Sequence, residues 1–436
     1  LTELDKLSVI GVQQIDRVVE VVDETLKGNS VRLLGEKKIK DETGKRTKRK
    51  AGGADLSLPK IRKNEFIEII PINTGCLNQC TYCKTKHARG DLGSYTVADI
   101  VSRIRQVRED KQVKEIWLTS EDTGAYGLDI DTNISDLLEE ICHVLDEDGT
   151  DVMVRIGMTN PPYILNHLET IAKALNHPKV YAFLHIPVQS ASDKVLNDMK
   201  RKYTVKDFET VVEYMLDHVP RIHIATDIIC GFPTETDECF DKTLELIEKF
   251  KFPAVNISQF YSRPGTIAAR MKKLDTKIVK DRSRRLTKLF KSYILFGDRI
   301  GEIHNVLITE KAKDNWHFVG HNKTYDHFLV APLETENNMI DLMGLCVEVE
   351  IVSVGKYFIK GDLTSSCQKQ LIQGIWDKTF HCPTGCLDGN TTQRSNNNIL
   401  ENFGAYFPYL RLLFVFSTTI FTLFVVVFGR FDVNLH

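Results

Sequence analysis

The sequence predicts an α/β protein with a partial (βα)6 barrel, followed by a small antiparallel β-barrel and a C-terminal transmembrane helix. Between residues 66 and 260, short β-like runs alternate with stretches of helical period, which is typical of a parallel sheet. Residues 300–363 contain short runs in which apolar and polar residues alternate, as in a small β-barrel. Near the C-terminus, 18 consecutive residues (412–429) carry no charge.

Length and composition limit the possible classes of protein. The chain has 436 residues, enough for two to four domains of about 150 residues each. Its formal net charge of −2 means that any affinity for nucleic acid must come from a local basic patch. The ten cysteines do not show the regular spacing of small disulfide-bonded domains, which favours a location in a reducing compartment. The sequence begins at Leu1 without an initiator Met or a signal peptide, so we expect a fragment or a product that lacks upstream coding sequence.

The first 63 residues are expected to lie outside the barrel. Residues 1–28 are predicted to be the remnant of an earlier domain, with one amphipathic helix over 4–26 that ends at Gly28. Residues 29–63 include a basic run, which indicates a solvated linker; contact with RNA is the alternative.

The predicted barrel domain covers residues 64–297. Its six strands are expected at 66–72, 115–120, 151–157, 181–188, 222–230 and 254–260. Helices are expected between them at 96–110, 133–147, 161–176, 204–218 and 235–250. Six units are too few for an eight-unit barrel, so we predict a partial one. In such barrels the chemistry lies on the loops that follow the strands. The alternative is that the polar residues of these loops are only helix caps and turns.

The loop after the first strand carries Cys76, Cys80 and Cys83 with the spacing C-x3-C-x2-C. Three thiolates on one short loop can bind three irons of a [4Fe–4S] cluster, which leaves the fourth iron without a protein ligand. The alternative is a zinc site of three cysteines completed by a distant histidine. Zinc motifs more often show two C-x2-C pairs, so the pattern favours the cluster.

The end of the barrel domain is strongly basic. Residues 270–291 hold ten Lys or Arg side chains against Asp275 and Asp281, a balance of +8 on a predicted helix. Such a helix can attract phosphates, and a plain solvated helix is the alternative. The small β-barrel that follows, at 298–363, is expected to be of an RNA-binding type.

Two segments are predicted at the C-terminus. Residues 364–408 are rich in Ser, Asn, Thr and Gln and are expected to form a flexible tether. Residues 409–430 are predicted to be a transmembrane anchor, with Arg411 and Arg430 at the two interfaces. A buried core helix, or sequence that is not normally translated, is the alternative.

Several motifs together resemble one family. They are the cysteine run at 76–83, KTKHARG at 84–90, TSEDTGAYG at 119–127, RIGMTNPP at 155–162, HIPVQSAS at 185–192 and DIICGFPTE at 227–235. The combination resembles the radical S-adenosylmethionine (SAM) methylthiotransferases over about residues 1–363. It is most similar to the archaeal and eukaryotic branch that acts on N6-threonylcarbamoyladenosine in tRNA, whose animal member carries a C-terminal membrane anchor. The resemblance implies a radical SAM barrel and a TRAM-like second barrel.

The resemblance also implies cofactors and a mechanism. SAM binds the open iron of the cluster and is cleaved to a 5′-deoxyadenosyl radical, which removes hydrogen from carbon-2 of the adenine. A methylated sulfur from a second [4Fe–4S] cluster is then inserted, and another SAM supplies the methyl group. The family holds that second cluster with three N-terminal cysteines, whereas no cysteine precedes Cys76 here. If this chain is the whole protein, SAM cleavage should survive while sulfur insertion should fail.

By the same resemblance, five residues are candidate SAM contacts. Tyr82 and Glu121 are expected near SAM, and Arg155 and Gln189 are expected at its polar parts. Gly231 is expected to form a turn that lets the backbone approach the adenosine. The alternative for Arg155 and Gln189 is a structural role inside the barrel.

The predicted function is therefore that of a transferase in tRNA processing, which methylthiolates carbon-2 of N6-threonylcarbamoyladenosine next to the anticodon. Its expected partners are tRNA, unidentified electron and sulfur donors, and the endoplasmic reticulum membrane, with the catalytic domains in the cytosol. One alternative is a sibling methylthiotransferase that acts on prenyl-adenosine or on a ribosomal protein. Another is a membrane-tethered tRNA-binding protein that does not thiolate.

Overall fold

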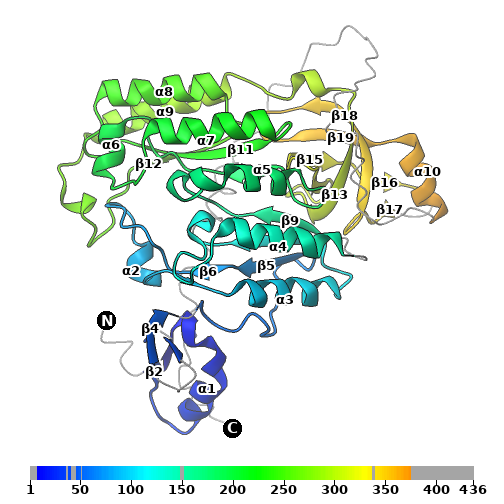
Figure 1. Cartoon of the computed structure of the whole chain (residues 1–436). Coiled ribbons are helices and arrows are strands. Elements are labelled where there is room, and N and C mark those ends of the chain that lie inside the picture. The colour runs from blue at the N-terminus through cyan, green and yellow to red at the C-terminus, as the bar shows by residue number, and fades with distance from the viewer. Residues whose placement is uncertain are drawn as a thin grey trace, which may run out of the picture.

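The computed structural model describes residues 7–35, 38–40, 46–50, 52–147, 152–335 and 339–374 (Figure 1). A small N-terminal unit projects below the main body in this view, and a second barrel lies at the right. The main body consists of six parallel strands with helices on their outer side.

The six strands of the main body follow one another in chain order. β5 (Ile67–Pro71), β8 (Glu115–Thr119) and β9 (Met153–Ile156) form one parallel sheet. β10 (Phe183–His185), β11 (His223–Cys230) and β12 (Ala254–Gln259) form another. A parallel bridge between Val154 and Val180 joins the two sheets, and no described strand links β5 to β12. The predicted partial (βα)6 barrel is therefore confirmed.

Most of the helices that cover these strands are close to their predicted positions, but the one predicted over 161–176 begins only at Leu168, because Pro161–Tyr163 and Leu165–His167 form 3₁₀ turns. The covering helices are α3 (Val97–Arg108), α4 (Ile134–Asp146), α5 (Leu168–Asn176), α7 (Val205–His218), α8 (Asp237–Phe250) and α9 (Thr276–Lys291). Thr96 and Asp99 form a reciprocal capping box at α3, which satisfies two backbone N–H groups that would otherwise lack partners. Two short helices, α2 (Thr85–Arg89) and α6 (Asp193–Asp198), were not predicted, because neither is long enough to show a periodic apolar pattern.

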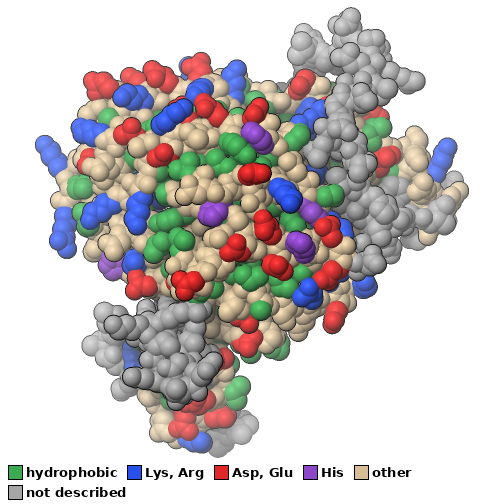
Figure 2. Space-filling view, viewed as in Figure 1, with side chains coloured by type: hydrophobic (Ala, Val, Ile, Leu, Met, Phe, Trp, Pro, Cys, Tyr) green, Lys and Arg blue, Asp and Glu red, His purple; other side chains and the backbone are tan. Residues whose placement is uncertain are grey.

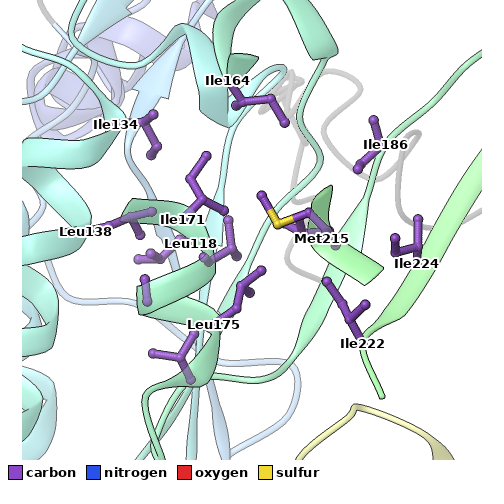
Figure 3. Close-up of a cluster of buried hydrophobic side chains, with 14 of the residues drawn as sticks. Leu118, Ile134, Leu138, Ile164, Ile171, Leu175, Ile186, Met215, Ile222 and Ile224 are labelled. Carbon is purple, nitrogen blue, oxygen red and sulfur yellow. The ribbon is translucent and has the colours of Figure 1, made fainter. Parts of the chain in front are cut away.

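The core of the main body is the apolar layer between strands and helices (Figure 3). Leu118 of β8, Ile171 of α5 and Met215 of α7 contribute to this layer and are almost completely buried. Burial of each such side chain stabilises the folded state by about 1.5–3 kcal/mol relative to leaving it exposed. The layer therefore fixes the strand ends from which the loops of the site emerge.

The second barrel is small, closed and mostly antiparallel. It contains β13 (Ile303–Lys311), β14 (Phe318–His321), β15 (His327–Val330), β18 (Cys346–Val354) and β19 (Ile359–Leu363), with a hairpin of β16 (Leu333–Glu334) and β17 (Met339–Ile340). This confirms the predicted barrel, although β15 and β19 pair in parallel. The prediction of a tether from residue 364 is wrong for α10 (Ser365–Gln373), because Thr364 caps this helix and Cys367 and Leu371 are buried in the barrel core.

A turn of the second barrel enters the N-terminal end of the parallel barrel. The Lys323 carbonyl accepts a hydrogen bond from the Ala182 N–H at 2.9 Å, and the Lys323 Nζ donates to the Leu175 carbonyl at 2.7 Å. The Tyr325 ring packs against Phe183 and Tyr181 with centroid distances of 5.1 and 4.8 Å. The two barrels thus share an interface that closes the end of the lumen away from the cysteine loop.

The N-terminal unit differs from its prediction. The expected helix over 4–26 is wrong, because β1 (Val9–Ile10) pairs in parallel with β2 (Arg32–Leu33) and the helix α1 covers only Val18–Leu26, after the 3₁₀ turn η2 (Val12–Arg17). Val9 and Ile10 are buried by this pairing, which a helical periodicity does not reveal.

The segment predicted as a basic linker contains ordered structure. β3 (Lys38–Lys40) and β4 (Arg46–Lys50) pair antiparallel within it. Leu56 joins the core of the main body, and the Tyr95 hydroxyl donates to the Ala54 carbonyl at 2.7 Å. The last part of this segment therefore belongs to the packed body.

The predicted anchor at 409–430 and most of the predicted tether lie outside the described residues. Across the ranges that the structure describes, no helix combines the length and the apolar character needed to span a bilayer.

Candidate functional site

The cysteine loop lies beyond the first strand of the barrel, as predicted. It follows β6 (Asn73–Thr74), which pairs with β7 (Gly93–Ser94). The Thr81 N–H donates to the Met199 carbonyl at 3.0 Å, and the Thr81 carbonyl accepts from the Ala268 N–H at 2.9 Å. Gly75 has φ +74°, and a Cβ there would lie 1.9 Å from the Asp91 carbonyl oxygen, so the loop requires glycine at this position. The loop is therefore held from two sides.

The three thiols of the loop are free and partly exposed. Burial raises the pKa of Cys76 to about 12, and the negative charges of Asp122 and of the other two thiols add to this effect. Cys83 Sγ accepts from the Thr85 N–H at 3.4 Å, and Cys80 Sγ accepts from Arg201 Nη1 at 3.4 Å. Ionisation of the Cys76 thiol is thus disfavoured here unless a cationic partner is bound.

These donors fit an iron–sulfur cluster. Cluster irons are bound by cysteine thiolates, and hydrogen bonds to the sulfurs tune the reduction potential. Both features are present, since three free thiols share one loop and Arg201 donates to one of them. Within the described ranges, no group of three His, Cys, Asp or Glu side chains lies close enough to hold one metal ion.

A buried polar network behind the loop was not predicted from the sequence. Asp122 accepts hydrogen bonds from the Asn160 N–H at 3.1 Å, from Asn160 Nδ2 at 2.7 Å and from Asn78 Nδ2 at 3.3 Å. Arg201 donates to the Asn160 side-chain oxygen and, at 3.0 Å, to the Tyr203 hydroxyl. The network connects the cysteine loop with the loops after β8 and β9 and with the segment after α6.

The Asp122 carboxyl is the buried acid of this network. Burial raises its pKa to about 6, although the hydrogen bonds from Asn160 and the charge of Arg201 act in the opposite direction. Asp122 and Asn160 lie inside motifs that the sequence analysis singled out, whereas Arg201 lies in none of them.

Of the predicted SAM contacts, Tyr82 lies within the cysteine loop and Glu121 lies close to the helix that follows it. The Tyr82 ring packs edge-on against Phe232, with centroids 6.5 Å apart and an interplanar angle of 78°. Glu121 is partly exposed, and its carboxylate lies 3.7 Å from Arg89 Nε at the end of α2. Burial raises the pKa of Glu121, and Arg89 partly offsets this.

Gln189 and Gly231 lie on adjacent strand ends. Gln189 has φ +69°, which is unusual for a residue with a side chain, and its backbone pairs with Asp227 and Ile229 of β11. Gly231 has φ +81°, and a Cβ there would meet the Val279 side chain at 2.5 Å. Its N–H donates to Glu235 Oε2 at 2.7 Å. The expected reason for this glycine was close approach to a ligand, but packing against α9 and the positive φ already require it.

Arg155 does not lie with the other candidates. It is in the middle of β9, in register with Trp117 of β8 and Ile69 of β5. Its guanidinium carbon lies 4.7 Å from the Phe183 ring centroid and 4.8 Å from that of Tyr325. Arg155 is therefore deep in the lumen, near the turn that closes the N-terminal end.

The lumen also contains a polar group that the sequence analysis did not single out. His185 Nε2 lies 2.7 Å from Asp227 Oδ1, and the same oxygen accepts from Asn256 Nδ2 at 2.8 Å. His185 and Asp227 are the first residues of two motifs quoted above, but only the alternation along the strands could have indicated that they face inward.

The basic helix predicted over 270–291 corresponds to α9, but α9 begins only at Thr276, so Arg270, Lys272 and Lys273 lie before it. The charges of α9 divide between two faces. Arg282 pairs with Glu235 and Asp237, and Arg285 pairs with Asp241. The other face carries an exposed basic stripe, formed by Lys277, Lys280, Arg284, Lys288 and Lys291. An open groove borders this stripe, lined by Gln259, Lys280, Ser283, Arg284, Thr287, Lys288, Lys291 and Ser292.

The stripe differs from the surface over α7 and α8. On that surface, basic and acidic side chains are interspersed (Figure 2). The groove begins at Gln259, the last residue of β12, whose Nε2 donates to Ser283 Oγ at 2.8 Å. Two residues further along the rim, the Tyr261 side chain is 77% exposed. The basic stripe and the exposed Tyr261 ring thus follow one another toward the barrel rim.

Comparisons with known proteins agree with this site. The radical SAM superfamily model matches residues 70–247. The chain is 56% identical over 397 residues to the threonylcarbamoyladenosine tRNA methylthiotransferase of Drosophila pseudoobscura pseudoobscura, which covers 91% of this chain and 68% of that protein. It is 55% identical over 365 residues to the Homo sapiens protein of the same name, covering 84% and 60%. The probable enzyme of Pyrococcus abyssi is 40% identical over 307 residues, covering 70% and 68%. The chain thus spans only part of the length of these relatives.

Proposed function

Because this chain belongs to the threonylcarbamoyladenosine tRNA methylthiotransferases of the radical SAM superfamily, we propose that it attaches a methylthio group to carbon-2 of N6-threonylcarbamoyladenosine next to the anticodon of tRNA. The observation that carries this proposal is the loop of three free cysteines at the strand ends of a partial barrel, in a chain 56% identical to such an enzyme. The proposed class is a radical SAM transferase.

Cys76, Cys80 and Cys83 would hold a [4Fe–4S] cluster with one iron open to SAM. When bound, the cluster and SAM supply the radical chemistry that an unactivated C–H bond requires, which no side chain can supply. The protein contributes position and charge. The Arg201 guanidinium donates to Cys80 Sγ, and the Asp122–Asn160–Asn78 network holds the loop against the loops after β8 and β9.

The remaining SAM contacts are proposed from their places around the rim. Tyr82 lies within the cysteine loop and Glu121 lies beside Arg89, which follows that loop, while Gln189 and Gly231 lie at adjacent strand ends. The turn at 321–326 closes the opposite end of the lumen, which limits the access of water to a reacting base.

We propose that the basic stripe of α9 binds the tRNA backbone and that Tyr261 stacks a base at the rim. Replacing Lys280, Arg284 and Lys288 with Gln should reduce the slope of log affinity against log salt by about 2 to 3, since each phosphate contact contributes about 0.7–0.9. The matched control replaces three exposed lysines away from the groove, namely Lys111, Lys206 and Lys242. An equal effect of the two triple variants would contradict this surface.

The function is tested in cells that lack the endogenous activity. Expression of this chain joined to any upstream coding sequence should convert N6-threonylcarbamoyladenosine of tRNA to its 2-methylthio form, measured by mass spectrometry of digested tRNA. Serine replacement of Cys80 should abolish the product. A methylthio group found only on prenyl-adenosine or on a ribosomal protein would assign the sibling function instead.

A second candidate function is a tRNA-binding protein that does not thiolate. Its iron content separates it from the methylthiotransferase. Anaerobically reconstituted protein with about four irons, SAM cleavage and no methylthio product would support it, whereas about eight irons would indicate the second cluster.

We further propose that residues 409–430 anchor the protein in the endoplasmic reticulum membrane, with the catalytic domains in the cytosol. The support is the uncharged run 412–429 between Arg411 and Arg430. Alkaline carbonate extraction should leave the protein in the membrane pellet, and its release into the supernatant would contradict the anchor.

A further inference from the structure

The lumen of the parallel barrel contains an arginine without a carboxylate partner among the described residues. Arg155 Nε is buried and makes no hydrogen bond there, and no described acidic side chain lies within 4.0 Å of its guanidinium. The guanidinium is bounded instead by aromatic rings, with Trp117, Phe183 and Tyr325 at 5.1, 4.7 and 4.8 Å. Stacking on aromatic faces orients the guanidinium plane and leaves its N–H groups directed along the edges.

The acidic groups of the same lumen are already engaged. Glu115 Oε2 accepts from Trp117 Nε1 at 2.8 Å, and its other oxygen accepts from the Tyr181 hydroxyl at 2.8 Å. Asp227 is held by His185 and Asn256. Arg155 therefore remains a positive charge, partly accessible to solvent, at mid-depth in the lumen. A charge in such a place is costly unless an anion joins it.

We infer that Arg155 binds the carboxylate of the threonylcarbamoyl substituent, and so selects an anionic modified adenosine as substrate. This inference rests on the proposed function, whose substrate carries a threonine carboxylate on the adenine N6 substituent. A guanidinium binds a carboxylate with two parallel hydrogen bonds, which gives both affinity and orientation. The surrounding rings of Trp117, Phe183 and Tyr325 offer flat apolar surfaces to the base and the threonine methyl group.

This role differs from a contact with SAM. The cysteine loop lies at the C-terminal ends of the strands, whereas Arg155 lies at mid-strand and touches Tyr325 of the turn that closes the N-terminal end. The same residue also bears on the choice between sibling substrates. An uncharged prenyl group would leave the guanidinium without a partner, and sites built for a polar group strongly reject analogues that lack it.

The experiment compares two RNA probes and three proteins. The probes are a tRNA anticodon stem-loop that carries threonylcarbamoyladenosine and the same stem-loop with the carboxylate replaced by a primary amide. The proteins are the detergent-solubilised full chain, its Arg155→Gln variant and a matched control, Arg105→Gln. The control removes an exposed arginine of α3 that pairs with Glu147. Binding is measured by fluorescence anisotropy, and SAM cleavage is measured without RNA.

The unaltered protein and the control should bind the carboxylate probe about 10- to 100-fold more tightly than the amide probe, the range for hydrogen bonds to charged groups. Arg155→Gln should bind both probes equally, at the level of the amide, with unchanged iron content and SAM cleavage. Arg155→Lys should restore part of the preference, because it keeps the charge without the bidentate geometry.

Two results would overturn the inference. One is an Arg155→Gln protein that keeps the full preference for the carboxylate. The other is an Arg155→Gln protein that loses SAM cleavage in the absence of RNA, which would assign Arg155 to SAM. A failure of the proposed function is distinguishable, since the unaltered protein would then prefer the carboxylate probe but form no methylthio product on it.

Discussion

Substitution of Asp326 by Asn should destabilise the junction of the two barrels much more than the same substitution at a surface ion pair. Asp326 Oδ2 lies 2.8 Å from Arg299 Nη1, and the two side chains are only 2% and 10% exposed. Asp326 also pairs with His223 at 3.1 Å and accepts from the Thr324 hydroxyl at 2.6 Å. The carboxylate is therefore at the centre of a buried network.

The magnitude follows from burial. Removing one member of a buried ion pair costs about 3–5 kcal/mol, because the other charge stays buried without a partner. Arg299 keeps a second carboxylate partner, Glu302, at 3.2 Å. The loss in free energy of unfolding should therefore lie near the lower limit of this range, about 3 kcal/mol, which is roughly 150-fold in the unfolding equilibrium constant. With a urea m-value of about 3 kcal/mol/M, the midpoint should fall by about 1 M.

The matched control is Asp241→Asn. Asp241 pairs with Arg285 at the same distance, 2.8 Å, but these side chains are 54% and 45% exposed. Exposed pairs contribute about 0–1 kcal/mol, so the midpoint should move by less than about 0.3 M. Unfolding is followed by the fluorescence of Trp117, which lies in the lumen, with Trp316 and Trp376 replaced by Phe. Equal shifts for the two Asp→Asn variants would refute the argument from burial.

The same carboxyl predicts a dependence on pH. Burial raises its pKa, but the hydrogen bond with His223 and the charge of Arg299 outweigh this and hold the pKa of Asp326 well below its usual value. A lowered pKa in the folded state means that the stabilisation is complete above about pH 4, the pKa of an unfolded aspartate, and is lost as the pH falls through the folded value. The stability difference between the unaltered protein and Asp326→Asn should therefore shrink below about pH 4, and a difference that grows there would contradict the sign.

Three further predictions concern the candidate site. Serine replacement of each loop cysteine should remove iron and visible absorbance, whereas Cys142→Ser should keep both; iron retained by all three loop variants would contradict the ligand set. Gly231→Ala should lower the free energy of unfolding in urea by about 1–3 kcal/mol, because of the positive φ at this position and the clash of the new Cβ with Val279. Adding Val279→Ala should restore only the part of the free energy that is lost to the clash. A Gly231→Ala variant with unchanged stability would refute both causes. Arg201→Gln should lower the reduction potential of the cluster in a redox titration, by about 59 mV for each 1.4 kcal/mol of lost stabilisation of the reduced state. Arg201→Lys should lower the potential less. An unchanged potential in Arg201→Gln would exclude the hydrogen bond to Cys80.

Most of the barrel could be predicted because its strands and helices carry strong local patterns. The cysteine loop was equally predictable, since its three cysteines lie within eight residues of sequence. Arg201 could not be predicted in the same way. It reaches Cys80 across 121 residues of chain, and nothing in its neighbourhood distinguishes it from a surface arginine. Asp122 and Asn160 were within quoted motifs, but only the fold shows that they bind each other.

The errors have a similar physical origin. The pattern at residues 4–26 has helical spacing, yet Val9 and Ile10 are buried by pairing with a strand that begins more than twenty residues later. The role of Gly231 was attributed to a ligand, while Val279 of α9 already excludes a side chain there. In both cases a partner distant in sequence decides the local structure.

The turn at 321–326 has a consequence for how the molecule can be divided. Because Tyr325 and Lys323 complete the floor of the catalytic barrel, the chain cannot be cut near residue 297 into two self-sufficient halves. The upstream half would present Phe183 and Tyr181 to water, and the downstream half would keep Arg299 and Asp326 without His223. The positions of the two barrels relative to each other are consequently set by this shared floor.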